Sequence, residues 1–418
     1  MKQIFFLLLL SFFSCTSQEF KNLDHMNPVK WEADVNQLND IIQNEFKTFQ
    51  PELKDKFDSN TKQLISELNQ LSNEEITIRL GQLIVGLENG HTEISAMQRV
   101  ANFKRMPLAM YIFNDSMYIY GAQKKYQHII GTRVVKIGRK TLDEILSALK
   151  TIMTHDNHYE ILYAGTTFML SPEVLKFLDI IDDMAQVQFE LEDSSGRIIH
   201  ETIIPLSIAE YKAGDWVSYT QMNAIQPTLS QKNQGKDYWY KYIAEHNAMY
   251  MYFGQVNNQK GEPSLKKFFK NMFKEIDNTK AQKLIVDLRY NTGGDNSKSK
   301  PLIEAIKKHP YLNKEGRVYV ITGRMTFSAA MATAVFLKRQ TNAILIGEPS
   351  RGNPNKSNNV EHKRLKNSGL LVEYTTRIIK HWPELGDLDH VPVDIEILKR
   401  FEHYQKGVDP VLEYIVKN

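Results

Sequence analysis

Two stretches of this sequence, each a buried strand followed by a polar turn, decide the fold. The first is Leu284-Ile285-Val286-Asp287-Leu288-Arg289-Tyr290-Asn291-Thr292-Gly293-Gly294. Its apolar run is typical of a strand that is buried on both faces. Its paired glycines let backbone N–H groups approach a ligand without interference from a Cβ atom. We therefore expect Gly293 and Gly294 to contribute to an oxyanion hole.

The second stretch leads from another buried strand, residues 317–322, to a serine. The turn that follows the strand is Gly323-Arg324-Met325-Thr326-Phe327-Ser328, and the alanine-rich residues 329–338 favour a helix. A hydroxyl at the start of a helix lies beside free N–H groups and the helix dipole, which stabilise developing negative charge. Ser328 is thus a candidate nucleophile, with the Ala329 N–H as a further oxyanion donor. The alternative is that Ser328 only caps the helix.

The composition excludes several classes of function. The chain has 418 residues, of which 42% are hydrophobic and 24% charged, as is ordinary for a globular protein of two or three domains. The net charge is only +3 and the basic residues are spread among acidic ones, so we expect no nucleic-acid partner. We find no glycine-rich phosphate loop and no cluster of His and Cys, and we therefore expect no cofactor and no metal.

The N-terminus has the pattern of an export signal. Met1-Lys2 precedes a short apolar run, residues 4–14, which is too short to span a bilayer. Cys15 follows directly and resembles the modified cysteine of a bacterial lipoprotein. The resemblance predicts a signal peptide over residues 1–14, a tether over 15–28 and a lipid-anchored protein of the bacterial cell envelope. The alternative is an ordinary signal peptide with an incidental cysteine. Since Cys15 is the only cysteine, disulfides cannot staple the mature chain.

The rest of the chain divides into three parts by its apolar periodicity. Residues 29–97 have helical spacing and predict an N-terminal helical cap. Within it, residues 72–75, which begin with Ser72, have the pattern of a capped start for a helix over 76–87. Residues 98–210 contain short alternating runs and predict a β-rich module. Residues 211–418 alternate between strand and helix, which predicts a layered α/β domain.

Three motifs in this order resemble those of the tail-specific, or C-terminal processing, serine proteases, and their tricorn-like branch in particular. Residues 287–294 resemble the family's Asp-Leu-Arg-x-Asn-x-Gly-Gly stretch, residues 326–330 its nucleophile segment and residues 347–352 a later turn. The resemblance implies a ClpP/crotonase-like fold for the catalytic domain, a PDZ-like module that includes residues 131–149, and a polypeptide substrate.

The expected general base departs from the commonest pattern of the family. Its processing proteases pair the serine with a lysine directly after the glycine equivalent to Gly352, where this chain has Asn353. Lys356 lies three residues further on, several ångströms beyond the reach of a general base. The tricorn-like branch uses the histidine of an Asp-Gly-His-Thr motif, which Gly90-His91-Thr92 resembles, with Asn89 in place of the aspartate. The resemblance therefore implies His91 as the base. The alternative is a histidine that caps the preceding helix.

The family also places an acidic residue late in the chain to orient the histidine. Residues 382–394 correspond to this region, with Glu384 as our first choice and Asp389 as the second; charges of a solvated loop are the alternative for both. We expect an envelope serine endopeptidase. Because Asn353 and Asn89 depart from the family, a catalytically weak or inactive protein that binds peptides or other extended ligands is the alternative.

Overall fold

The computed structural model describes residues 22–46, 51–94, 102–233 and 235–418, which form two compact units. Within this part of the chain, unit 1 consists of residues up to His155, Ala164–Ala224 and Asn358–Ile378. Unit 2 consists of Asp156–Tyr163, Ile225–Ser357 and Ile379–Asn418. The units thus interleave along the sequence, and their limits do not coincide with the predicted boundaries after residues 97 and 210. The predicted signal peptide, Cys15 and the first part of the tether lie outside the described residues.

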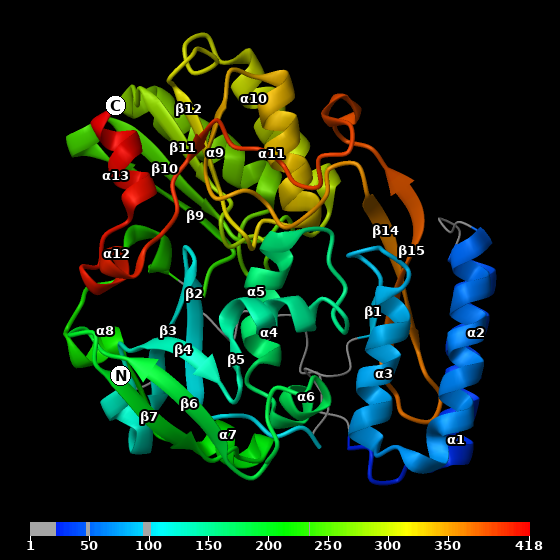
Figure 1. Cartoon of the computed structure of the whole chain (residues 1–418). Helices are drawn as coiled ribbons and strands as arrows, with labels where there is room; N and C mark the ends of the chain where they lie inside the picture. Colours follow the sequence, from blue (N-terminus) through cyan, green and yellow to red (C-terminus); the bar gives the residue numbers. More distant parts are fainter. Residues whose placement is uncertain (1–21, 47–50, 95–101, 234) are drawn as a thin grey trace. The chain divides into compact units, whose positions relative to one another are not determined.

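The helical region expected near the N-terminus belongs to unit 1. It comprises α1 (Pro28–Glu45), α2 (Pro51–Glu67) and α3 (Asn73–Val85) (Figure 1). The start of α3 is a capping box, as the sequence predicts: the Ser72 hydroxyl accepts from the Glu75 N–H at 3.2 Å, and the Glu75 carboxylate accepts from the Ser72 N–H at 2.8 Å. The helix ends at Val85, two residues before the predicted end.

A hairpin from late in the chain completes this helical region, and the sequence did not predict it. Its strands are β14 (Ser357–Arg364) and β15 (Leu371–Ile379), and β1 (Glu93–Ile94) pairs antiparallel with β15. The fully buried Asp34 of α1 accepts from the backbone N–H groups of Asn367 and Ser368 at 2.9 and 2.7 Å. The hairpin is therefore fastened both to a helix and to the short strand that follows residue 92.

The expected β-rich module forms the rest of unit 1. Its strands have the order β2-β3-β4-β6-β7, with β5 on β4 and β8 on β3. The elements are β2 (Leu108–Phe113), β3 (Ser116–Gln123), β4 (Arg133–Ile137), β5 (Lys140–Thr141), α4 (Leu142–Leu149), β6 (Val187–Glu192), β7 (Ile198–Ile203) and β8 (Trp216–Ser218). The module is confirmed as β-rich, whereas its likeness to a PDZ domain stays a prediction.

Unit 2 is built on a six-stranded sheet of the order β16-β13-β12-β11-β10-β9, parallel except for β9. The strands are β9 (Tyr238–Ile243), β10 (Ala248–Phe253), β11 (Lys283–Asp287), β12 (Val318–Thr322), β13 (Ile344–Gly347) and β16 (Ile395–Glu396). Both stretches that open the sequence analysis begin with central strands, β11 and β12. Their carboxyl ends lie at the same edge of the sheet because the strands are parallel, and ligands of open α/β sheets bind at that edge.

Alternating side chains of these strands enter two different cores. Met251, Val286 and Val320 pack under three helices, α9 (Leu265–Thr279), α10 (Lys300–Lys308) and α11 (Ser328–Gln340), on one face of the sheet (Figure 1). Tyr250 and Ile285 on the other face pack against α13 (Pro410–Lys417). Burial on both faces explains the continuous apolar runs of β11 and β12. The α/β class of this part is confirmed. None of the helices in the described part of the chain is both long and apolar enough to cross a membrane.

Candidate active site

Ser328 is the first residue of α11 and has a left-handed backbone, with φ = +49°. This conformation costs a non-glycine residue roughly 1–2 kcal/mol. The N-cap position belongs to Phe327, and no side-chain capping bond is made there. The capping alternative for Ser328 is therefore wrong. A serine held in a strained turn between a strand and a helix is typical of an activated nucleophile.

The glycine turn after β11 lies directly against Ser328. A Cβ atom on Gly293 would stand 2.8 Å from the Cβ of Ser328 and 3.2 Å from the backbone nitrogen of Ala329, and φ at Gly293 is +120°. Gly294 has φ = +133°, and a Cβ there would stand 2.7 Å from the carbonyl oxygen of Val256. Any side chain on these residues would clash, so the turn needs both glycines.

The hydrogen bonds of this turn show which of the candidate oxyanion donors are already engaged. The Gly293 N–H donates to Asn291 Oδ1 at 2.9 Å and is thus already engaged. The Gly293 carbonyl accepts from the Val256 N–H at 2.8 Å, and in a trans peptide this turns the Gly294 N–H away from Val256. In the described part of the chain, the N–H groups of Gly294 and Ala329 donate no hydrogen bond. These two are therefore the available donors. Gly293, which has no side chain, permits the close approach of its turn to Ser328.

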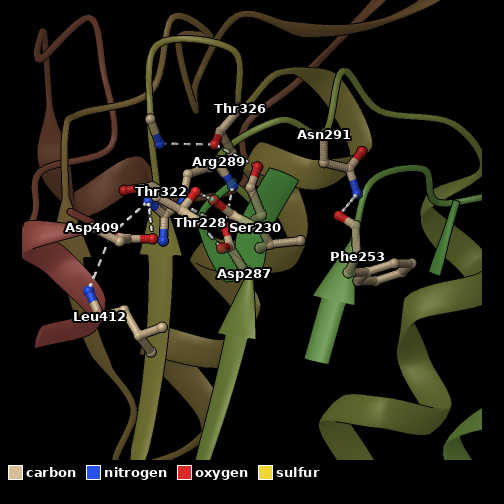
Figure 2. Close-up of polar contacts among 12 residues, drawn as sticks. Thr228, Ser230, Phe253, Asp287, Arg289, Asn291, Thr322, Thr326, Asp409 and Leu412 are labelled. Carbon is tan, nitrogen blue, oxygen red and sulfur yellow. Dashed lines mark hydrogen bonds and ion pairs between the residues drawn. The ribbon is translucent and has the colours of Figure 1, made fainter. Parts of the chain in front are cut away.

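Backbone and side-chain hydrogen bonds tie the two turns together. The Thr326 hydroxyl donates to the Leu288 carbonyl at 2.9 Å and accepts from the Gly323 N–H at 3.0 Å. The Phe327 N–H donates to the Asn291 carbonyl at 3.1 Å. Asn291 Nδ2 in turn donates to the Phe253 carbonyl at 2.8 Å, as Figure 2 shows. The position of the serine is thus set by the ends of three strands.

The charged residues of the first motif form a buried network beside this frame (Figure 2). Arg289 Nε donates to Asp287 Oδ1 at 2.9 Å, Arg289 Nη1 to Asp409 Oδ1 at 3.0 Å, and the Tyr250 hydroxyl to Asp287 Oδ2 at 2.6 Å. Burial alone would lower the pKa of Arg289, but the charges of Asp287 and Asp409 raise it well above its usual value. Burial would raise the pKa of Asp409, and the Arg289 charge holds it below its usual value. Asp409 also caps α13, so this network is structural.

Arg351, which the sequence did not single out, packs against the residue before the nucleophile. Its guanidinium carbon lies 4.2 Å from the ring centroid of Phe327 and 4.4 Å from that of Tyr163 in α5 (His158–Phe168). Its Nη1 stands 3.4 Å from Glu160 Oε1. A cation between two aromatic rings depends on tertiary contacts, which leave no signal in the sequence spacing.

Asn353 takes a structural role at the position where the family resemblance places a lysine. Its Oδ1 accepts from the Asn355 N–H at 2.8 Å, and its own N–H donates to Asp156 Oδ2 at 3.2 Å. The side chain thus closes a turn of its own loop. The Lys356 side chain is exposed.

His91 lies in the turn between α3 and β1 and is buried, with 5% of its surface exposed. Its backbone N–H donates to Asn89 Oδ1 at 3.0 Å, and the Thr92 hydroxyl donates to the same oxygen at 3.2 Å. Asn89 therefore supplies the acceptor that an aspartate would supply in this turn. The histidine follows the end of α3 by six residues, so it does not cap that helix. His91 belongs to unit 1 and Ser328 to unit 2.

The two candidate carboxylates lie in different surroundings. Glu384 Oε1 stands 2.7 Å from Nη2 of Arg339, which lies eleven residues after Ser328 in α11. At about 1.5 Å per residue, this is roughly 16 Å along the helix from the nucleophile. Glu384 is thus paired with an arginine near the end of α11 that is remote from Ser328, and its catalytic role stays a prediction.

Asp389, the second choice, lies beside the loop that contacts Phe327. Asn157 Nδ2 donates to the Asp389 carbonyl at 2.8 Å and to the Ser350 carbonyl at 3.2 Å, joining the two segments. The Asp389 carboxylate stands 2.8 Å from His390 Nδ1, a second histidine that the sequence reasoning missed. Among the described residues, no group of three or more His, Cys, Asp or Glu side chains is placed to hold a metal ion.

Comparisons with known proteins agree with this architecture. Residues 296–382 match the family model described as Peptidase family S41. Mature CPAF complexed with lactacystin is 12% identical with a TM-score of 0.61, and the match covers 93% of this chain and 97% of that chain. A second structure of mature CPAF is 11% identical with a TM-score of 0.60, covering 93% and 96%. At these identities the likeness shows the fold alone. The photosystem II D1 C-terminal processing protease is 12% identical, covers 93% and 96%, and has a TM-score of only 0.41. No curated protein matches the sequence.

Proposed function

We propose that this chain, whose residues 296–382 match the model of peptidase family S41, is a serine-type peptidase that hydrolyses peptide bonds through an acyl-enzyme on Ser328. The observation that carries this proposal is the strained backbone of Ser328, at φ = +49°, packed directly against Gly293. A serine with a purely structural role gains nothing from this strain, whereas a nucleophile is exposed by it.

The proposed reaction uses His91 to move one proton. Ser328 Oγ attacks the peptide carbonyl carbon while its proton passes to the imidazole, and the carbonyl oxygen gains the negative charge. The N–H groups of Ala329 and Gly294 stabilise this oxyanion. The imidazole then returns the proton to the leaving amine, and water hydrolyses the acyl-enzyme. This mechanism requires His91 of unit 1 to come within hydrogen-bond reach of Ser328 in unit 2.

Asp389 is the carboxylate that we assign to the orientation of His91. It is joined through Asn157 to the loop that packs on Phe327, whereas Glu384 is paired with Arg339. This role requires the Asp389 carboxylate to leave His390. We expect Asp389→Asn to lower the acylation rate more than Glu384→Gln does.

The test is covalent labelling by a fluorophosphonate, followed together with cleavage of unfolded polypeptides. Ser328→Ala should abolish both signals, and His91→Ala should slow both by a factor of about 10³ or more. The matched control is His390→Ala, which removes another histidine and should retain most of the rate. Labelling that persists in Ser328→Ala would overturn the nucleophile. A folded wild-type chain that neither labels nor cleaves would favour the alternative, a protein that binds extended ligands.

We also propose that the enzyme is anchored in the bacterial envelope by lipid on Cys15. The support is the basic and apolar segment before that cysteine. The chain expressed in a bacterial host should incorporate a fatty-acid analogue, and Cys15→Ser should not. If the wild type and Cys15→Ser incorporate the fatty-acid analogue equally, lipid is not attached to Cys15. If the wild type is exported without incorporating the analogue, the segment is an ordinary signal peptide.

A further inference from the structure

The outward side of α9 and α10 in unit 2 carries a concentration of exposed lysines, which we call the basic face. Its members are Lys266, Lys267, Lys270, Lys274, Lys280, Lys300, Lys307 and Lys308. The same two helices and the C-cap of α9 carry only three carboxylates, on Glu275, Asp277 and Glu304. The face therefore has an excess of five positive charges in a chain whose net charge is +3. The remainder of the chain is net negative, so the positive charge is localised here.

Helical spacing places the lysines of α9 on one side. Its apolar residues Leu265, Phe268, Phe269, Met272 and Ile276 are buried in the core under the sheet. Lys266, Lys270 and Lys274 recur every four residues on the opposite side, and Lys267 lies next to them. At about 100° of rotation per residue, these four lysines share roughly 100° of the helix surface.

The positive charges of the α9 lysines are not neutralised by ion pairs in the described part of the chain. In the described part of the chain, no lysine of α9 forms a salt bridge, although lysines elsewhere do, such as Lys338 with Asp394 at 2.7 Å. Asp277 instead stands 3.3 Å from His309, and Glu304 stands 3.7 Å from Lys308. The α9 lysines therefore direct their full charge into solvent.

We propose that the basic face binds the surface of an anionic phospholipid membrane. Neither α9 nor α10 contains arginine, so the face lacks the planar donors that recognise nucleic-acid phosphates and base edges. Ammonium groups act as point charges and suit a diffuse negative surface, where each contributes separately. Electrostatic attraction to anionic lipids adds to the membrane affinity that lipid on Cys15 would supply. This proposal does not depend on the catalytic residues.

The experiment uses the unlipidated chain from Thr16 onward, which contains every described residue, and measures cosedimentation with phospholipid vesicles. We expect binding to vesicles of mixed phosphatidylcholine and phosphatidylglycerol but not to phosphatidylcholine alone. Binding should weaken at least tenfold between about 0.05 and 0.5 M salt, because screening shortens the range of the charges. The proposal would be overturned if the chain bound equally well to vesicles with and without phosphatidylglycerol, or equally well at low and high salt.

A pair of matched variants separates the face from the net charge. Lys266→Glu/Lys270→Glu/Lys274→Glu should weaken vesicle binding by about tenfold or more. Lys56→Glu/Lys150→Glu/Lys176→Glu makes the same charge change at exposed positions of unit 1 and should stay within about twofold of the wild type. Both variants should retain the wild-type thermal unfolding midpoint. Equal losses of vesicle binding in the two triple variants would show that net charge alone drives binding. Tighter binding of duplex DNA than of vesicles at equal salt would show that the face binds nucleic acid. Either result overturns the proposal.

Discussion

At the scale of single residues, the backbone of Ser328 offers a measurement that distinguishes function from stability. The left-handed conformation costs a residue with a Cβ atom roughly 1–2 kcal/mol and costs glycine almost nothing. We expect Ser328→Gly to raise the free energy of unfolding by about 1 kcal/mol, less the extra entropy of an unfolded glycine, while it abolishes fluorophosphonate labelling. Ser328→Ala keeps the strain and should leave stability nearly unchanged. Urea unfolding measures both, and a destabilised glycine variant would contradict the strain.

Gly293 is the residue whose replacement should harm the nucleophile most directly. In Gly293→Ala the new methyl group would meet the Cβ of Ser328 at 2.8 Å. We expect at least a hundredfold loss in the rate of labelling, because the clash must displace the nucleophile or the turn. The control is Gly316→Ala, where φ is +72° but no atom stands within 4 Å of the new methyl group. If both variants label at the wild-type rate, the contact between the two turns has no catalytic importance.

At the scale of elements, the strands and helices of unit 2 could be predicted from the sequence, whereas their partners could not. The runs around Val286 and Val320 are continuous because both faces are buried, and this gives a strong local signal. The sequence could not decide between Glu384 and Asp389, because both lie in one irregular loop where no periodicity distinguishes them. The two residues differ in their tertiary contacts: Glu384 pairs with Arg339, and the Asp389 carbonyl accepts from Asn157. Both partners are distant in sequence.

The hairpin of β14 and β15 gives a prediction at this scale. The buried carboxylate of Asp34 accepts from two backbone N–H groups and from Asn367 Nδ2. Asp34→Ala leaves these donors unpaired and should lower the free energy of unfolding by about 3 kcal/mol. It should also slow labelling of Ser328, since β1, which pairs with this hairpin, follows His91 closely. Asp34→Asn keeps one acceptor oxygen and should cost less. Urea unfolding and labelling rates test this, and an unaltered stability would contradict it.

At the scale of the whole molecule, the interleaving of the two units determines which fragments can fold. The predicted catalytic domain, residues 211–418, lacks Asp156–Tyr163, which belong to unit 2 and hold Ser350, Arg351 and Asn353. It also contains the hairpin without its Asp34 partner. We expect this fragment to unfold without a cooperative thermal transition and to escape labelling. Circular dichroism during heating checks this, with the chain from Thr16 as the control; a cooperative, labelled fragment would restore the predicted boundary.

The turn closed by Asn353 has a consequence for any attempt to place a lysine base at this position. Substituting lysine there would remove the acceptor that holds the Asn355 N–H, so the change would loosen the loop before it could supply a base. A serine and lysine pair at this site would therefore need a further change that restores an acceptor for the Asn355 N–H. The geometry of this loop therefore favours a base from another part of the chain, as the proposed mechanism requires.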